Sequence, residues 1–203
     1  MYISASRMRS VEQPRRVVFY ITTIVWEWLL MGYVLFGVRR HGTSLWDVLG
    51  ARWKNAKDFF RDMGIALLFW FLALVVLGAV AYLLHYERMS QSVRFLAPEG
   101  ATEILLWIAV SLTAGICEET IFRGYLQKQL IAWTGNAPAG VVLSAAAFGV
   151  GHIYQGAKAT VVIGAYGLLF GILAQLRKSV RPGMMTHALH DTVTGLALRL
   201  LPK

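Results

Sequence analysis

The sequence predicts an all-α fold: a polytopic integral membrane helical bundle of about six transmembrane helices plus one interfacial amphipathic helix. Of the 203 residues, 57% are hydrophobic and only 15% are charged, and the mean hydropathy is +0.54. Soluble domains carry about 25% charged residues, so this composition excludes an ordinary soluble core. Several apolar runs also approach the roughly 20 residues that a helix needs to cross a bilayer. We therefore expect one continuous membrane domain.

The N-terminal part, residues 1–100, supplies two predicted spans and the interfacial helix. The first apolar run covers 17–36 and has four arginines before it but no small-residue cleavage site after it. This pattern favours a retained membrane helix over a removed signal peptide. The second span covers 64–84. Between the two spans, 44–62 alternates aromatic and charged residues at helical spacing, which is typical of a helix lying in the membrane interface.

The C-terminal part, residues 101–203, supplies the other spans and is the expected catalytic core. One span starts near Glu103 and runs into an acidic motif. The next covers 138–152, where a proline suits the first helical turn. Another covers 160–176, and its glycines would let neighbouring helices approach closely. The last helix covers 182–201.

The net charge of +9 is explained by membrane orientation, because the basic residues mainly flank apolar runs. We therefore expect the lipid bilayer as a partner and no nucleic acid. The positive-inside rule places 39–61 and the 177–181 turn in the cytoplasm and the 87–100 loop outside, which also puts the N-terminus outside. The single cysteine, Cys117, excludes an intramolecular disulfide framework.

Two adjacent carboxylates and an arginine follow the apolar start of the third predicted span. Ionisable groups inside a membrane cost about 2.5–3.5 kcal/mol each, so they indicate a function by default. Glu119 and Arg123 are four residues apart and would pair on one helix face. Glu118 points about 100° away from Glu119 and has no local cation, so it could act on a water.

Two further spans carry histidines. His152 follows a run of small residues, 144–151, that would allow close helix packing. His187 and Asp191 are four residues apart and share a helix face. With a rise of about 1.5 Å per residue, these residues and Glu118 all fall within the thickness of the membrane, where they could meet.

Three motifs therefore occur in order, each on its own apolar helix: Glu118-Glu119-x-x-x-Arg123, Phe148-x-x-x-His152 and His187-x-x-x-Asp191. Together they resemble the motifs of the CAAX-protease and bacteriocin-processing family (CPBP, or Abi), whose members are intramembrane endopeptidases related to type II CAAX prenyl proteases. Gly124 also fits this pattern. The resemblance covers about 103–195. It departs from the family at Asp191, where the third motif often has asparagine.

The resemblance implies hydrolysis of a peptide bond in or beside the membrane, with a peptide or membrane protein as substrate. Glu118 would be the general base that activates water, and His152 would help to hold that water. His187 and Asp191 would bind the developing oxyanion or a metal. The similarity is to bacterial members, so we expect the bacterial cytoplasmic membrane as the location.

The resemblance says less about the roles of the supporting residues and about a cofactor. Glu119 and Arg123 would position Glu118, although they could also be a purely structural ion pair, and Phe148 would pack. The catalytic residues offer a zinc set of two imidazoles and two carboxylates: Glu118, His152, His187 and Asp191. The His-Glu-x-x-His motif of soluble zinc proteases is absent. The resemblance is compatible with a divalent metal and with none.

Other interpretations stay open at this level. Cys117 could be a nucleophile, although a buried packing thiol is far commoner. We interpret His190 as structural, and Glu27 as an inward-facing structural carboxylate or an accessory polar group. The same ionisable residues could instead form the relay of a proton-coupled transporter. A membrane scaffold or immunity protein without chemistry is a further alternative.

Overall fold

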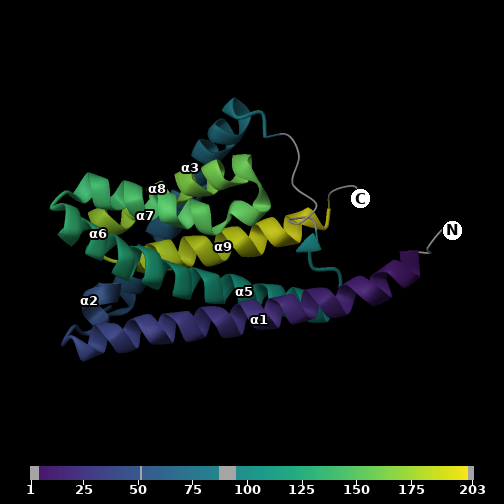
Figure 1. Cartoon of the computed structure of the whole chain (residues 1–203), viewed down its shortest axis with the longest axis horizontal. Helices are drawn as coiled ribbons and strands as arrows, with labels where there is room; N and C mark the ends of the chain where they lie inside the picture. Colours follow the sequence, from purple (N-terminus) through teal and green to yellow (C-terminus); the bar gives the residue numbers. More distant parts are fainter. Residues whose placement is uncertain (1–4, 51, 87–94, 201–203) are drawn as a thin grey trace.

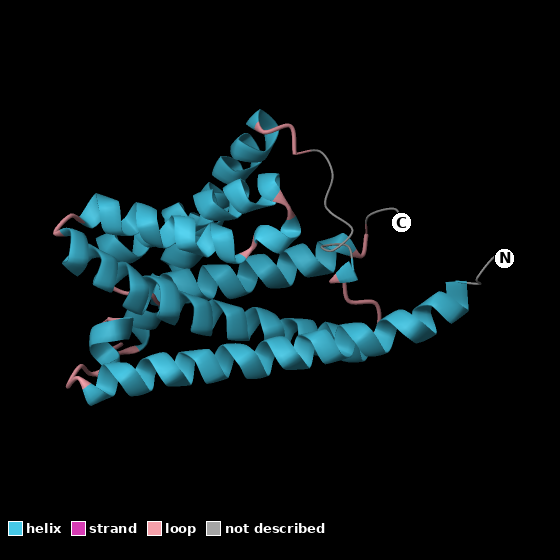
Figure 2. Cartoon of the chain, viewed as in Figure 1, coloured by secondary structure: helices cyan, strands magenta, loops and turns pink. Residues whose placement is uncertain are grey.

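A computed structural model describes residues 5–50, 52–86 and 95–200, with side chains from Arg15 onward. In these ranges the structure consists of helices joined by turns and has no strand (Figure 2). The elements in chain order are α1 (Ala5–Arg40), α2 (Leu45–Leu49), α3 (Ala56–Leu83), α5 (Ala101–Glu118), the π-helix η1 (Glu119–Leu126), α6 (Gln127–Thr134), α7 (Ala137–Gly151), the short 3-10 helix η2 (Ile153–Gln155), α8 (Ala157–Arg177) and α9 (Arg181–Leu198).

The all-α membrane bundle predicted from the sequence is confirmed. Within the described residues, four helical segments are long and apolar enough to cross a membrane: Arg15–Arg40, Ala56–Leu83, Ala101–Thr134 and Ala157–Arg177. Helix α7 is apolar but shorter. Helix α9 carries the polar third motif. With α7 and α9, the long segments agree with the predicted count of about six.

Helix α9 occupies the middle of the bundle, where it packs against α5, α3 and α8, while α1 runs beside α5 (Figure 1). Small residues make the close approach of α5 and α9 feasible. A Cβ atom on Gly115 would lie 2.7 Å from the Met184 carbonyl oxygen and 2.9 Å from the Ala188 nitrogen. Helix α7 packs on α8 in a similar way through Gly149. The three helices that carry the motifs are thereby held in one bundle.

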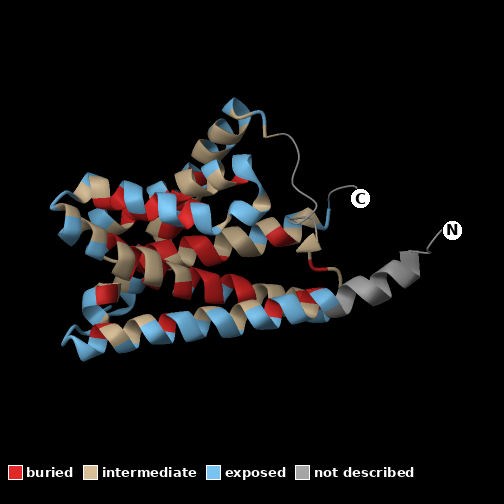
Figure 3. Cartoon of the chain, in the orientation of Figure 1, coloured by how far each residue is buried: buried red, intermediate tan, exposed pale blue. Residues whose placement is uncertain are grey.

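Buried residues are concentrated in the inner helices, whereas Arg15–Arg40 of α1 is mostly exposed (Figure 3). One buried apolar cluster joins α3, α7 and α8 and consists of Phe69, Ala73, Phe148, Tyr166, Phe170 and Leu173. Large apolar residues remain exposed on the outer faces of the helices, such as Leu68 at 73% and Val75 at 71%. An outer surface of this kind is the one that a lipid environment requires.

The prediction of a single interfacial helix over 44–62 is wrong. The chain forms the short helix α2, turns at Gly50 with φ of 91°, and begins α3 at Ala56. Each start has its own cap: Ser44 forms a capping box with Asp47, and the Asn55 side chain accepts a hydrogen bond from the Asp58 nitrogen at 3.0 Å. These local hydrogen bonds favour two helix starts over one continuous helix.

The segment around α2 packs on the turn between α8 and α9. The Val180 nitrogen donates to the Leu49 carbonyl at 3.2 Å, and Gly50 forms an isolated bridge with Ser179. At the same end, Arg177 lies 3.3 Å from the Asp62 carboxylate. The two basic segments that the positive-inside rule assigns to one side of the membrane therefore lie at one end of the bundle.

Candidate active site

The acidic motif lies where α5 changes into a π-helix. Glu118 is the last residue of α5, and η1 covers Glu119–Leu126. The Gln127 nitrogen at the end of η1 donates to the Phe122 carbonyl five residues earlier, which is the π pattern. The outer face of η1 is held by α2, because a Cβ atom on Gly124 would lie only 2.7 Å from Val48 Cγ1. Departures of this kind from α-helical winding are frequent at functional sites.

The structure contains the Glu119–Arg123 ion pair that the spacing predicts. Arg123 Nη1 lies 2.9 Å from Glu119 Oε1, and both side chains are 1% exposed. Arg123 Nη2 also donates to the Gly167 carbonyl at 3.3 Å, and the guanidinium lies 4.2 Å from the centre of the Phe148 ring. Phe148 thus packs between the ion pair and the histidines, as its predicted packing role requires.

His187 connects the first and third motifs. Its Nδ1 lies 3.2 Å from Glu119 Oε1. A carboxylate engaged by an arginine accepts hydrogen bonds, so we assign the proton at this contact to His187 Nδ1. The other ring nitrogen, Nε2, lies 3.5 Å from Asp191 Oδ2 and 3.8 Å from Glu118 Oε2.

His152 follows the last residue of α7 and is held by its own helix. Its Nδ1 lies 2.9 Å from the Phe148 carbonyl oxygen, which can only accept, so Nδ1 is the donor. In the neutral ring, this contact leaves Nε2 as an acceptor. The ring centres of His152 and Phe148 are 4.8 Å apart.

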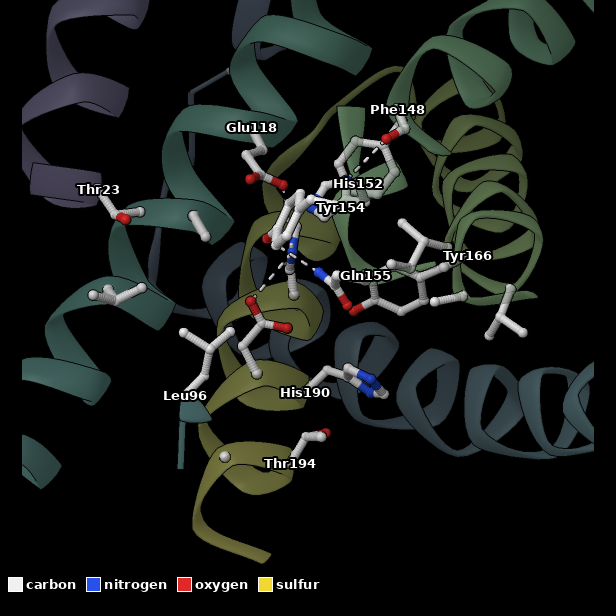
Figure 4. Close-up of a pocket in the computed structure, with 18 of the residues that line it drawn as sticks. Thr23, Leu96, Glu118, Phe148, His152, Tyr154, Gln155, Tyr166, His190 and Thr194 are labelled. Carbon is white, nitrogen blue, oxygen red and sulfur yellow. Dashed lines mark hydrogen bonds and ion pairs between the residues drawn. The ribbon is translucent and has the colours of Figure 1, made fainter. Parts of the chain in front are cut away.

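One cavity of about 290 Å³ brings together the four residues predicted to be catalytic (Figure 4). Glu118 enters it from α5, His152 from the end of α7, and His187 and Asp191 from α9. Most of the other lining residues are apolar or aromatic, such as Val110 and Ile163. The site is a largely apolar chamber with a few converging polar groups, which is typical of ligand sites.

Several further polar residues line the cavity, and sequence reasoning gave them little weight. His190 and Glu27, both interpreted as structural, are among them. Tyr154 and Gln155 on η2 also line it, and Gln155 Nε2 donates to the Tyr154 hydroxyl at 3.1 Å. Burial raises the pKa of Tyr154 above its ordinary value. A carboxylate within an apolar run was a usable signal for Glu27, whereas Tyr154 has no signal beyond its nearness to His152.

Two of the remaining hypotheses can be compared with this geometry. Cys117 is fully buried and is not among the residues that line the cavity. Over the described ranges, no three His, Cys, Asp or Glu residues are grouped so that they could hold a metal ion. The zinc set of Glu118, His152, His187 and Asp191 stays a prediction.

Comparison with known proteins gives one match. Residues 100–193 match the family model described as type II CAAX prenyl endopeptidase Rce1-like. No curated protein and no solved structure matches the chain. The matched region extends from the start of α5 into α9 and contains all three motifs. Through this region the chain is similar to the type II CAAX prenyl endopeptidases, a family of membrane proteases.

Proposed function

We propose that the cavity is the active site of an intramembrane endopeptidase in which Glu118 activates a water molecule. The observation that carries this proposal is the environment of Glu118 Oε2. This atom is buried and has no hydrogen-bond partner among the described residues. It lies 3.8 Å from His187 Nε2, which is too far for a direct hydrogen bond but suits a bridging water.

The arrangement supports a complete hydrolytic cycle. The Glu118 carboxylate takes a proton from the water, and the water oxygen attacks the carbonyl carbon of the scissile peptide bond. The C–O bond forms while the carbonyl electrons move onto its oxygen. Doubly protonated His187, which faces the carboxylates of Glu118 and Asp191, would donate its Nε2–H to that oxyanion. When the C–N bond breaks, protonated Glu118 returns its proton to the leaving amine.

The buried ion pair supports this division of roles between the two adjacent glutamates. Glu119 is engaged by Arg123 at 2.9 Å and by His187 at 3.2 Å. Its task would be to fix His187 in position, because a histidine held at one ring nitrogen presents the other in a defined direction. The Glu118 carboxylate is not engaged in this way, so it is available to accept a proton from the water.

The surroundings favour a peptide or membrane-protein substrate. The exposed outer faces of the bundle are apolar, and the cavity is mainly apolar, so a substrate segment would be hydrolysed in or beside the membrane. We infer a bacterial cytoplasmic membrane as the setting.

The direct test is cleavage of a quenched fluorescent peptide library by the reconstituted protein, with wild type compared with Glu118→Gln. The amide keeps the size of the side chain but cannot accept the proton, so we expect turnover to fall by about 10²–10⁴-fold. Asp58→Asn is the matched control, because this carboxylate does not line the cavity. Equal cleavage by wild type and Glu118→Gln would remove Glu118 from the mechanism.

The same preparation addresses the open alternatives. Chelator added to the cleavage assay tests for a required metal. Uptake that follows a proton gradient, without peptide cleavage, would support a transporter. Partner binding that is insensitive to Glu118→Gln, again without cleavage, would support a scaffold.

A further inference from the structure

Glu27 is an ionisable residue that the proposed mechanism does not use. It lies on α1, outside the region that matches the protease family. Next to it, Trp28 Nε1 donates to Thr113 Oγ1 on α5 at 3.2 Å, which fixes this part of α1 against the motif helix. Glu27 consequently lines the same cavity as Glu118.

The Glu27 side chain has an unsatisfied oxygen atom in the part of the chain that the structure describes. Its Oε2 atom is buried and has no hydrogen-bond partner among the described residues. No lysine or arginine is among the residues that line the cavity. A carboxylate at membrane depth is costly, and such groups are normally paired or used. A basic group on a molecule that enters the cavity would supply this partner.

The other acidic groups of the cavity are arranged differently. Glu118 and Asp191 both face His187, at 3.8 Å and 3.5 Å from its Nε2. Glu27 enters the cavity from α1, a helix that packs against α5, whereas the histidines come from α7 and α9. A cation bound by Glu27 would therefore lie in the cavity that also contains Glu118.

We propose that Glu27 is a specificity residue that binds a basic side chain, lysine or arginine, of the peptide substrate next to the bond that is cleaved. This inference rests on the proposed function, because it assigns the substrate class to that cavity. Hydrogen bonds between oppositely charged groups are the strong ones, so a basic substrate side chain would complete the Glu27 site.

A measurement of peptide binding tests this inference independently of catalysis. We would measure the affinity of two peptides that differ only by lysine or uncharged norleucine, using Glu118→Gln protein so that turnover does not interfere. The lysine peptide should bind about 10- to 100-fold more tightly, and Glu27→Gln added to this protein should abolish the difference. Glu27→Lys should reverse it, so that a peptide with glutamate at that position binds better than the lysine peptide.

The controls distinguish the two proposals. Asp58→Asn should leave the lysine preference intact, because Asp58 does not line the cavity. If the protein prefers the lysine peptide but the wild type cleaves neither peptide, the proposed Glu27 site is supported and the proposed protease function is rejected. The specificity role would be overturned if Glu27→Gln lowered cleavage of both peptides equally and left the ratio of their affinities unchanged. Equal affinity of both peptides for the Glu118→Gln protein would overturn it as well.

Discussion

Removal of Arg123 should expose how strongly the bundle depends on the buried ion pair. In Arg123→Met the apolar side chain keeps much of the volume, but Glu119 loses the cation at 2.9 Å. Breaking a buried pair by removing one partner costs about 3–5 kcal/mol, because the other charge stays buried without compensation. For a chain of this length, this corresponds to a melting temperature lower by about 6–20 °C.

A second change should return part of that stability. Glu119→Gln removes the unpaired charge, and its side-chain oxygen can still accept from His187 Nδ1, which lies 3.2 Å from the present carboxylate oxygen. We expect Glu119→Gln/Arg123→Met to regain about 1–3 kcal/mol relative to Arg123→Met alone. Activity should stay low, because the π-helix then loses the contact that fixes it against α8.

The assay is thermal unfolding of detergent-solubilised protein, with Arg61→Met as control. Arg61 is 57% exposed and lies 3.3 Å from Asp58, so its loss should cost no more than about 1 kcal/mol. The reasoning is refuted if Arg123→Met melts no lower than Arg61→Met. It is also refuted if the double variant is as unstable as the sum of the two single changes.

Two further substitutions test packing and the third motif. Gly115→Ala places a methyl group 2.7 Å from the Met184 carbonyl oxygen, so we expect the free energy of unfolding to fall by about 1–3 kcal/mol, as measured by thermal unfolding. Gly78→Ala is the control: a methyl group there would have no neighbouring atom within 4 Å, so this change should be neutral or slightly stabilising. Asp191→Asn should keep peptide cleavage within about tenfold of wild type, because the amide can still contact His187 and can donate to an oxyanion. A loss beyond about 100-fold would mean that the Asp191 charge itself is needed.

The sequence predicted the features that depend on local composition and short spacing. Apolar runs located the helices, and the span expected over 138–152 is the shorter apolar helix α7, Ala137–Gly151. The spacing of four residues predicted the pairing of Glu119 with Arg123, and the estimated depths of the motifs along their helices allowed a shared site. The family expectation is confirmed by the match over 100–193.

The features that depend on contacts between distant segments could not be read from the sequence. The π-helix η1 is one such feature, because its position depends on a close contact between Gly124 and Val48 of α2. The turn at Gly50 is another, because helical spacing continues through 44–62 although Gly50 docks on Ser179. Arg16 is a third: it is among the arginines that the orientation rule placed outside, and it is paired with Glu103 at 3.2 Å.

Glu27 and the groups proposed for hydrolysis come from different parts of the chain. The groups proposed for hydrolysis all come from α5, α7 and α9, which are buried against one another and lie largely in the family-matched region. Helix α1 lies outside that region, is mostly exposed over Arg15–Arg40 (Figure 3), and lines the cavity with Thr23 (Figure 4) and Glu27. Changes on an exposed helix disturb packing less than changes in a closely packed interior. Helix α1 can therefore alter the shape and charge of the cavity while the proposed catalytic groups stay in place, so the preference for a substrate is best sought on α1.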